Sequence, residues 1–318
     1  MTEEMIVHGV EWTAKELFVY PNEFIYWSIQ IVMYPYMTGL VAGAFVLSSL
    51  YHVFGQKDLK EIAQFSLVFS LALLPVAALP LLLHLQQPMR AIEPLLTPHF
   101  TSAIAAFGIV FTTYALIVLS EIWFVYRVYF VHELEVLKGS RGFWNMLRRG
   151  LYTVLTLGAR DTSDAAVKVD HKAAKILAGV GIPVACFLHG YAGFIFGSVK
   201  ANALWMSPLM PVIFIMSAVV SGIALCMLTY IIIMEWKSFR SRRRDSAAAA
   251  GEIKGAEIEI IGKATRYLLG FLVAAISLEL LDLIFRGYTA MKSWDILRSV
   301  MYGKDFVNIF VLQYTLGN

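Results

Sequence analysis

Several side chains that could bind a ligand or exchange protons lie inside apolar stretches of the sequence. If successive stretches cross a membrane in alternating directions, these side chains come to a similar depth on one side of it. They come from four stretches, which contribute Gln30 and Tyr34, His84, His189 and Tyr191, and Glu279 and Asp282. Glu121, in a fifth stretch, lies toward the opposite side. Ionisable groups in hydrocarbon are costly, so each is a functional candidate. Tyrosine, histidine and glutamine can donate hydrogen bonds to both carbonyl oxygens of a quinone, and histidine or a carboxylate can exchange its protons.

The stretches that carry these residues have the length of membrane-spanning helices. A bilayer core about 30 Å thick needs roughly 20 apolar residues, and six stretches reach that length: 24–53, 62–86, 101–131, 173–198, 207–235 and 264–286. A seventh apolar run, 306–318, is too short to span, and we expect it to be a helix cut by the end of the sequence. The predicted fold is all-α: a single polytopic transmembrane helix bundle, 23–318, after an N-terminal segment, 1–22.

The composition indicates a membrane protein and argues against other classes. The chain is 58% hydrophobic and 15% charged, whereas soluble domains are roughly 25% charged. A net charge of +3 is too small to indicate a nucleic-acid partner. The two cysteines, Cys186 and Cys226, are too few for an iron–sulfur cluster, which needs about four ligands. We therefore expect no metal site in this chain, and the cysteines are interpreted as buried thiols.

Loop charges predict the orientation of the bundle. Most loop Lys and Arg residues fall on one side, chiefly in two long loops, 132–172 and 236–263. Because basic loops stay in the cytoplasm, these loops are predicted to be cytoplasmic and the N-terminus to lie outside. Within them, 139–157 has the pattern of an amphipathic helix at the lipid bilayer interface, and 240–256 is predicted to be a flexible basic linker. The polar cluster then lies near the outer face, with Glu121 toward the inner one.

Other interpretations stay open at this point. A single b-type haem would need two facing histidines, for which only His84 and His189 lie at a suitable depth. Prolines inside the apolar stretches could break helices, as in a proton- or ion-coupled transporter without redox chemistry. Some groups could be structural: His84 and Arg90 could lie at headgroup level, and Asp282 could pair with Arg286 four residues later. Whether Glu121 pairs with Arg127 is also open.

Three motifs in order along 24–235 carry a resemblance. The first is Trp27 followed by YPYMTGLVAG at 34–43, the second is LQQPMR at 85–90 followed by TPHFTS at 97–102, and the third is HGYAG at 189–193 followed by ALW at 203–205 and LMPVIF at 209–214. Together they resemble the membrane subunits of the polysulfide reductase NrfD-like family. The rest of the chain is similar only in hydropathy.

The resemblance implies a fold and a function. Members have eight or more helices, bind a quinone (menaquinone or ubiquinone) near the outer face, and normally lack haem. They exchange electrons with a ferredoxin-like iron–sulfur subunit on that side and, through it, with a catalytic subunit that often carries molybdopterin. By motif, the quinone-contacting positions fall on Tyr34, ahead of Gly39, and on Tyr191. Tyr34 stands where some members have histidine.

The resulting hypothesis is a quinone-reactive subunit of a multi-subunit respiratory oxidoreductase in the cytoplasmic (inner) membrane of a bacterium or archaeon. Residues expected to bind the quinone are Tyr34, Gln30, His189, Tyr191 and Arg90. Residues expected to handle protons are His84, Asp282 and Glu121. Arg90 and the outer loops are also expected to face the iron–sulfur partner.

Overall fold

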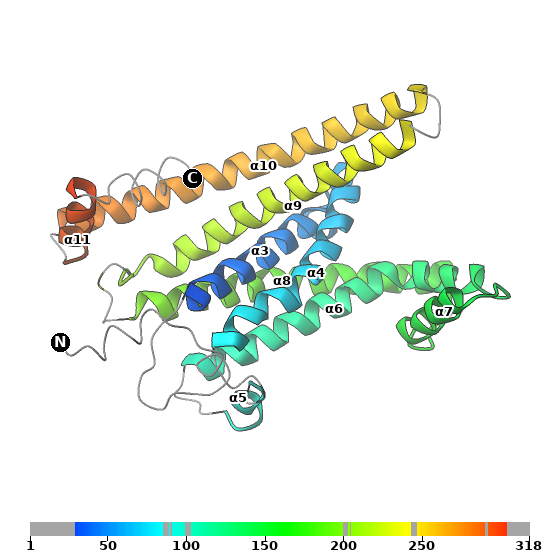
Figure 1. Ribbon diagram of the computed structural model, residues 1–318, viewed down its shortest axis with the longest axis horizontal. Coiled ribbons are helices and arrows are strands. Elements are labelled where there is room, and N and C mark those ends of the chain that lie inside the picture. Colours follow the sequence, from blue (N-terminus) through cyan, green and yellow to red (C-terminus); the bar gives the residue numbers. More distant parts are fainter. Residues whose placement is uncertain are drawn as a thin grey trace.

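The computed structural model describes residues 29–84, 89, 91–98, 103–199, 203, 205–242, 247–289 and 292–303. Six long helices run side by side through this part of the chain (Figure 1). They are α3 (Ile29–His52), α4 (Lys60–His84), α6 (Ala103–Val136), α8 (Asp164–Gly197), α9 (Met210–Arg242) and α10 (Ala247–Tyr288). Shorter helices are η1 (Lys57–Leu59), α5 (Glu93–Leu96), α7 (Phe143–Leu155) and α11 (Lys292–Tyr302).

The all-α bundle and its six spans are confirmed. Within the described residues, six helices are long and apolar enough to cross a membrane, over Ile29–His52, Lys57–His84, Ala105–Val136, Asp164–Gly197, Met210–Phe239 and Ile258–Tyr288. The N-terminal segment, 1–22, and the seventh run, 306–318, lie outside the described residues.

The prediction of a flexible linker at 240–256 is wrong for the part of it that the structure describes. Helix α9 continues to Arg242, and α10 begins at Ala247 and runs unbroken into the sixth span. The physical reason is the four alanines at 247–250, followed by glutamates and a lysine, which favour helix strongly even outside a membrane.

Helix α3 is the centre of the bundle. It packs against α4, α8 and α9, while α6 packs against α8 and α10 lies at the edge beside α9 (Figure 1). Small residues allow the closest approach: a Cβ added to Gly222 of α9 would lie 2.6 Å from the Cα of Gly43 in α3. Without Cβ atoms at this crossing the two backbones touch, which is how helices commonly associate in lipid.

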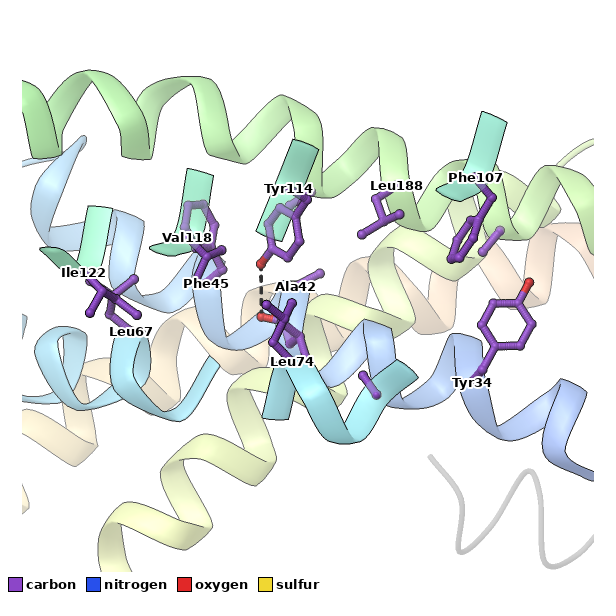
Figure 2. Close-up of a cluster of buried hydrophobic side chains, with 14 of the residues drawn as sticks. Tyr34, Ala42, Phe45, Leu67, Leu74, Phe107, Tyr114, Val118, Ile122 and Leu188 are labelled. Carbon is purple, nitrogen blue, oxygen red and sulfur yellow. Dashed lines mark hydrogen bonds between the residues drawn. The ribbon is translucent and has the colours of Figure 1, made fainter. Parts of the chain in front are cut away.

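Aromatic and branched side chains fill the space between α3, α4, α6 and α8. Figure 2 shows this cluster, with Tyr34 and Phe107 at one end and Leu67 and Ile122 at the other. Phe45 and Tyr114 are both fully buried and meet edge to face, with ring centroids 5.6 Å apart. The cluster fixes the rotation of α3, so the residues on its opposite side face α9.

The amphipathic helix predicted within 139–157 is present as α7. Every residue of this helix is at least partly exposed, and its large side chains, among them Phe143, Trp144 and Leu151, are solvent-facing in the isolated chain. The indole Nε1 of Trp123 donates to the carbonyl oxygen of Leu155 at 2.9 Å, which ties the end of α7 to α6. The helix therefore lies beside α6, at the end of the bundle opposite α5 and α11 (Figure 1).

Candidate functional site

A cavity of about 420 Å³ lies where α3, α8 and α9 meet. We call it the His189 cavity. Its aromatic walls include Phe196, Trp205 and Phe214, and its polar lining includes His189, Ser217 and Ser221. Binding sites for small organic molecules have this composition, with mostly apolar walls and a few polar groups that orient the ligand.

The imidazole of His189 brings a buried, unsatisfied polar atom to this lining. His189 is 5% exposed, and its Nδ1 has no hydrogen-bond partner among the described residues. The ring lies 5.7 Å from the ring of Phe214, centroid to centroid. Buried polar atoms normally have a partner, so an imidazole left in this state is suited to bind a ligand.

Three glycines bring the walls of the cavity together. A Cβ on Gly39 of α3 would lie 2.8 Å from Cε1 of His189, so the absence of a side chain makes room for the imidazole. On α8, a Cβ on Gly193 would lie 2.8 Å from the carbonyl oxygen of Met210, and one on Gly197 would lie 2.8 Å from that of Ser207. The Gly-x-x-x-Gly spacing thus lets the start of α9, and with it Phe214, approach His189.

Tyr34 lines a different cavity, of about 210 Å³, on the other side of α3. We call it the Tyr34 cavity. It lies among α3, α4 and α6, and its wall includes Thr38, Phe107 and Thr112. The Tyr34 ring meets Phe107 edge to face at 5.4 Å (Figure 2) and Phe196 at 6.4 Å. Phe196 also lines the His189 cavity, so its ring stands between Tyr34 and that cavity.

Tyr34, His189 and Tyr191, which the sequence predicted around one headgroup, do not share a cavity. Tyr191 lines neither cavity and packs between Phe187 and Phe194, at centroid distances of 5.8 and 5.6 Å. Residues advance about 100° each around a helix, so positions 189 and 191 of α8 point about 200° apart. The two side chains therefore lie on different sides of α8, although they are two residues apart in the HGYAG motif.

The same end of the bundle also carries Gln30, His84 and Asp282, which lie apart from one another. Gln30 lies in the first turn of α3 and the half-buried His84 ends α4, and neither lines the His189 cavity or the Tyr34 cavity. Arg90 lies outside the described residues. Asp282 is buried in an ion pair, with Nε of Arg286 2.6 Å from its Oδ2 and the hydroxyl of Ser207 donating to its Oδ1. The structural interpretation of Asp282, a pair with Arg286, is confirmed.

Arg127 pairs with Asp170 of α8 rather than with Glu121. Its Nε lies 2.9 Å and its Nη2 2.7 Å from Oδ2 of Asp170, and its Nη1 donates to the carbonyl oxygens of Ala159 and Asp161. The carboxylate of Asp161 accepts the backbone N–H of Ser163 at 2.9 Å, which holds the pKa of Asp161 below its usual value. Sequence reasoning missed Asp170 because it lies 43 residues from its partner.

Phe196, Ser217 and Ser221 also line the His189 cavity, and the sequence did not single them out. Trp205 and Phe214 belong to the motifs ALW and LMPVIF, but nothing in the spacing of these motifs predicted that the two side chains lie beside His189. The i,i+4 spacing of Ser217 and Ser221 shows that both lie on one face of α9. Which helix that face meets depends on the crossing of α3 and α9.

Two known proteins that are similar to this chain are named as subunits of reductases. A selenate reductase subunit of Mesobacillus selenatarsenatis is 34% identical over 210 residues, which is 64% of this chain and 47% of that protein. A protein described as a dimethyl sulfoxide reductase membrane subunit of Halobacterium salinarum is 27% identical over 220 residues, 68% of this chain and 46% of that protein. The chain spans about half the length of these relatives.

The model of one protein family, polysulphide reductase NrfD, matches residues 20–314, nearly the whole sequence. The match includes all six spans and both cavities, and it agrees with the motif-based resemblance. The chain belongs to the NrfD polysulphide reductase family.

Proposed function

We propose that this chain is the quinone-reactive membrane subunit of a multi-subunit reductase, and that the quinone headgroup binds in the His189 cavity. The observation that carries the proposal is the buried Nδ1 of His189, which has no partner among the described residues, in an aromatic-lined cavity. Aromatic walls suit a flat headgroup. The polar atoms are few, as expected for a site that orients two carbonyl oxygens.

Interconversion of quinone and quinol moves two electrons and two protons. His189 would exchange a proton with one quinone oxygen, since a positioned imidazole is the commonest general acid and base in proteins. The hydroxyls of Ser217 and Ser221 are the candidates for a hydrogen bond to the second oxygen. The hydroxyl of Ser221 already donates to the carbonyl of Ser217 at 2.8 Å, so Ser217 is the better donor.

The electrons would pass to or from partner subunits. The names of the two relatives support membership of a reductase complex. By the family resemblance, the partner is a ferredoxin-like iron–sulfur subunit on the outer side, connected to a catalytic subunit that often carries molybdopterin. In this proposal the chain lies in the cytoplasmic membrane with its N-terminus outside, and the end that carries both cavities faces that partner.

The test is quinone binding and turnover in the purified, lipid-embedded complex. His189→Ala is expected to lower turnover on the order of 100-fold, the usual contribution of a positioned acid–base group. His132→Ala, which removes an exposed histidine of α6, is the matched control and is expected to match the wild type. Wild-type rates and quinone affinity in His189→Ala would refute the site.

A further inference from the structure

Glu121 of α6 is an acidic side chain sealed inside the bundle. It is 0% exposed, and both of its carboxyl oxygens lack a hydrogen-bond partner among the described residues. It lies seven residues after Tyr114, which is two helical turns and hence the same face of α6. The proposed quinone site does not use it, because it lies on the inner side of the core cluster and lines neither cavity.

The nearest cation along the helix is already engaged. Arg127 makes three hydrogen bonds to the carboxylate of Asp170 and two more to backbone carbonyls. A carboxylate with neither a cation nor donors is very costly in an apolar interior, and such a group is neutralised by taking up a proton. The surroundings of Glu121 therefore favour the carboxylic acid.

Hydroxyl groups lie in the same core, between the level of Glu121 and the outer end of the bundle. Tyr114 and Ser70 both donate to the carbonyl oxygen of Val41, at 3.5 and 3.2 Å. Figure 2 shows the Tyr114 hydroxyl directed at α3, between Ile122 at the Glu121 level and Tyr34 at the far end. Tyr34, Thr38 and Val41 are spaced along one face of α3, and the first two line the Tyr34 cavity.

We propose that Glu121 holds an exchangeable proton and is the inner member of a proton relay that runs through Tyr114 and Ser70 toward the Tyr34 cavity. In each cycle the O–H bond of Glu121 breaks and its proton passes to water on the Tyr114 side. Each hydroxyl or water that accepts a proton gives up one of its own toward the Tyr34 cavity, and the last proton passes the Phe196 ring, which lies between Tyr34 and the quinone site, and forms an O–H bond on the quinone. The carboxylate of Glu121 regains a proton from the inner aqueous side. No electrons move in this step. The relay rests on the proposed function, because quinone turnover supplies the demand for protons.

The first measurement is the infrared carbonyl band of a protonated carboxylic acid in the purified, lipid-embedded complex. The wild type is expected to show this band at neutral pH, with a shift in D₂O because the proton exchanges. Glu121→Gln should lose it, while Glu135→Gln, which changes an exposed carboxylate of the same helix, should keep it. Absence of the band in the wild type, or its survival in Glu121→Gln, would overturn the inference without reference to any quinone.

The second measurement is proton uptake from the inner side of proteoliposomes during quinone turnover. Glu121→Gln is expected to slow uptake on the order of 100-fold while leaving quinone affinity unchanged. Glu121→Asp, which keeps a carboxyl group, should restore part of the uptake. Unchanged proton uptake in Glu121→Gln would overturn the relay. If the wild-type complex did not bind quinone at all, that result would count against the His189 site but would leave the infrared result for Glu121 unaffected.

Discussion

The imidazole of His189 lies directly against the backbone of Gly39. A Cβ at Gly39 would be 2.8 Å from Cε1 and 3.1 Å from Nε2 of His189. Contacts this short do not persist, so any side chain at position 39 must move the imidazole. The first glycine of the Tyr34–Gly43 motif therefore positions a residue on another helix that is distant in sequence.

Gly39→Ala should reduce quinone affinity roughly tenfold, on the scale of the 1–3 kcal/mol that overpacking usually costs, because the displaced imidazole no longer faces the cavity in the same orientation. Binding of a quinone analogue to the lipid-embedded complex measures this. The matched control is Gly179→Ala in α8, where a Cβ meets nothing within 4 Å. Equal affinity in both variants would contradict the packing argument.

The crossing of α3 and α9 should be the most substitution-sensitive packing in the bundle. Gly222→Ala places a methyl group 2.6 Å from the Cα of Gly43, where only backbone can yield. We expect a loss of about 1–3 kcal/mol of stability, measured by thermal unfolding in detergent. Gly270→Ala, in open space on α10, should be neutral or slightly stabilising.

The Arg127–Asp170 pair should be necessary for folding at the α7 end of the bundle. Both side chains are almost fully buried, and removing one partner leaves the other charge buried and unpaired, at a cost of about 3–5 kcal/mol. Asp170→Asn is therefore expected to lower the unfolding temperature sharply. Glu135→Ala, which breaks an exposed pair with Lys138, should cost less than about 1 kcal/mol of stability. Similar losses of stability in the two variants would contradict the argument from burial.

Helix α7 is expected to lie in the membrane interface with its apolar face in the lipid. Spin labels at Leu151 and Arg149 test this, because the two positions point about 200° apart on the helix. The label at 151 should be accessible to oxygen, which partitions into lipid, and the label at 149 to a water-soluble nickel complex. Equal accessibility of the two labels to the nickel complex would place α7 in water instead.

Much of the fold was predictable because the bilayer imposes simple rules. A spanning helix needs about 20 apolar residues, so the hydrophobic runs alone located the six spans, and the aromatic and basic pattern of 139–157 located α7. The error at 240–256 arose because basic and small residues suggested a linker, whereas alanine and glutamate favour helix when no packing is required.

The sequence predicted how far along its helix each polar residue lies better than it predicted which residues share a site. The sequence placed Tyr34, His189, Asp282 and Glu121 along their helices, since rise per residue is constant. It could not fix the rotation of each helix, which decides whether a side chain faces a cavity, an ion pair or lipid. That rotation depends on interhelical contacts such as Gly43 with Gly222, between residues distant in sequence.

By itself, therefore, the sequence determined the class of protein, its six spans and the level at which its polar residues lie, because each follows from local composition and helix geometry. Only the tertiary structure separated Tyr34 from His189, paired Arg127 with Asp170 and left the carboxyl oxygens of Glu121 without a partner among the described residues. These relationships join helices that are far apart in the chain, and they are set by how small residues allow those helices to pack.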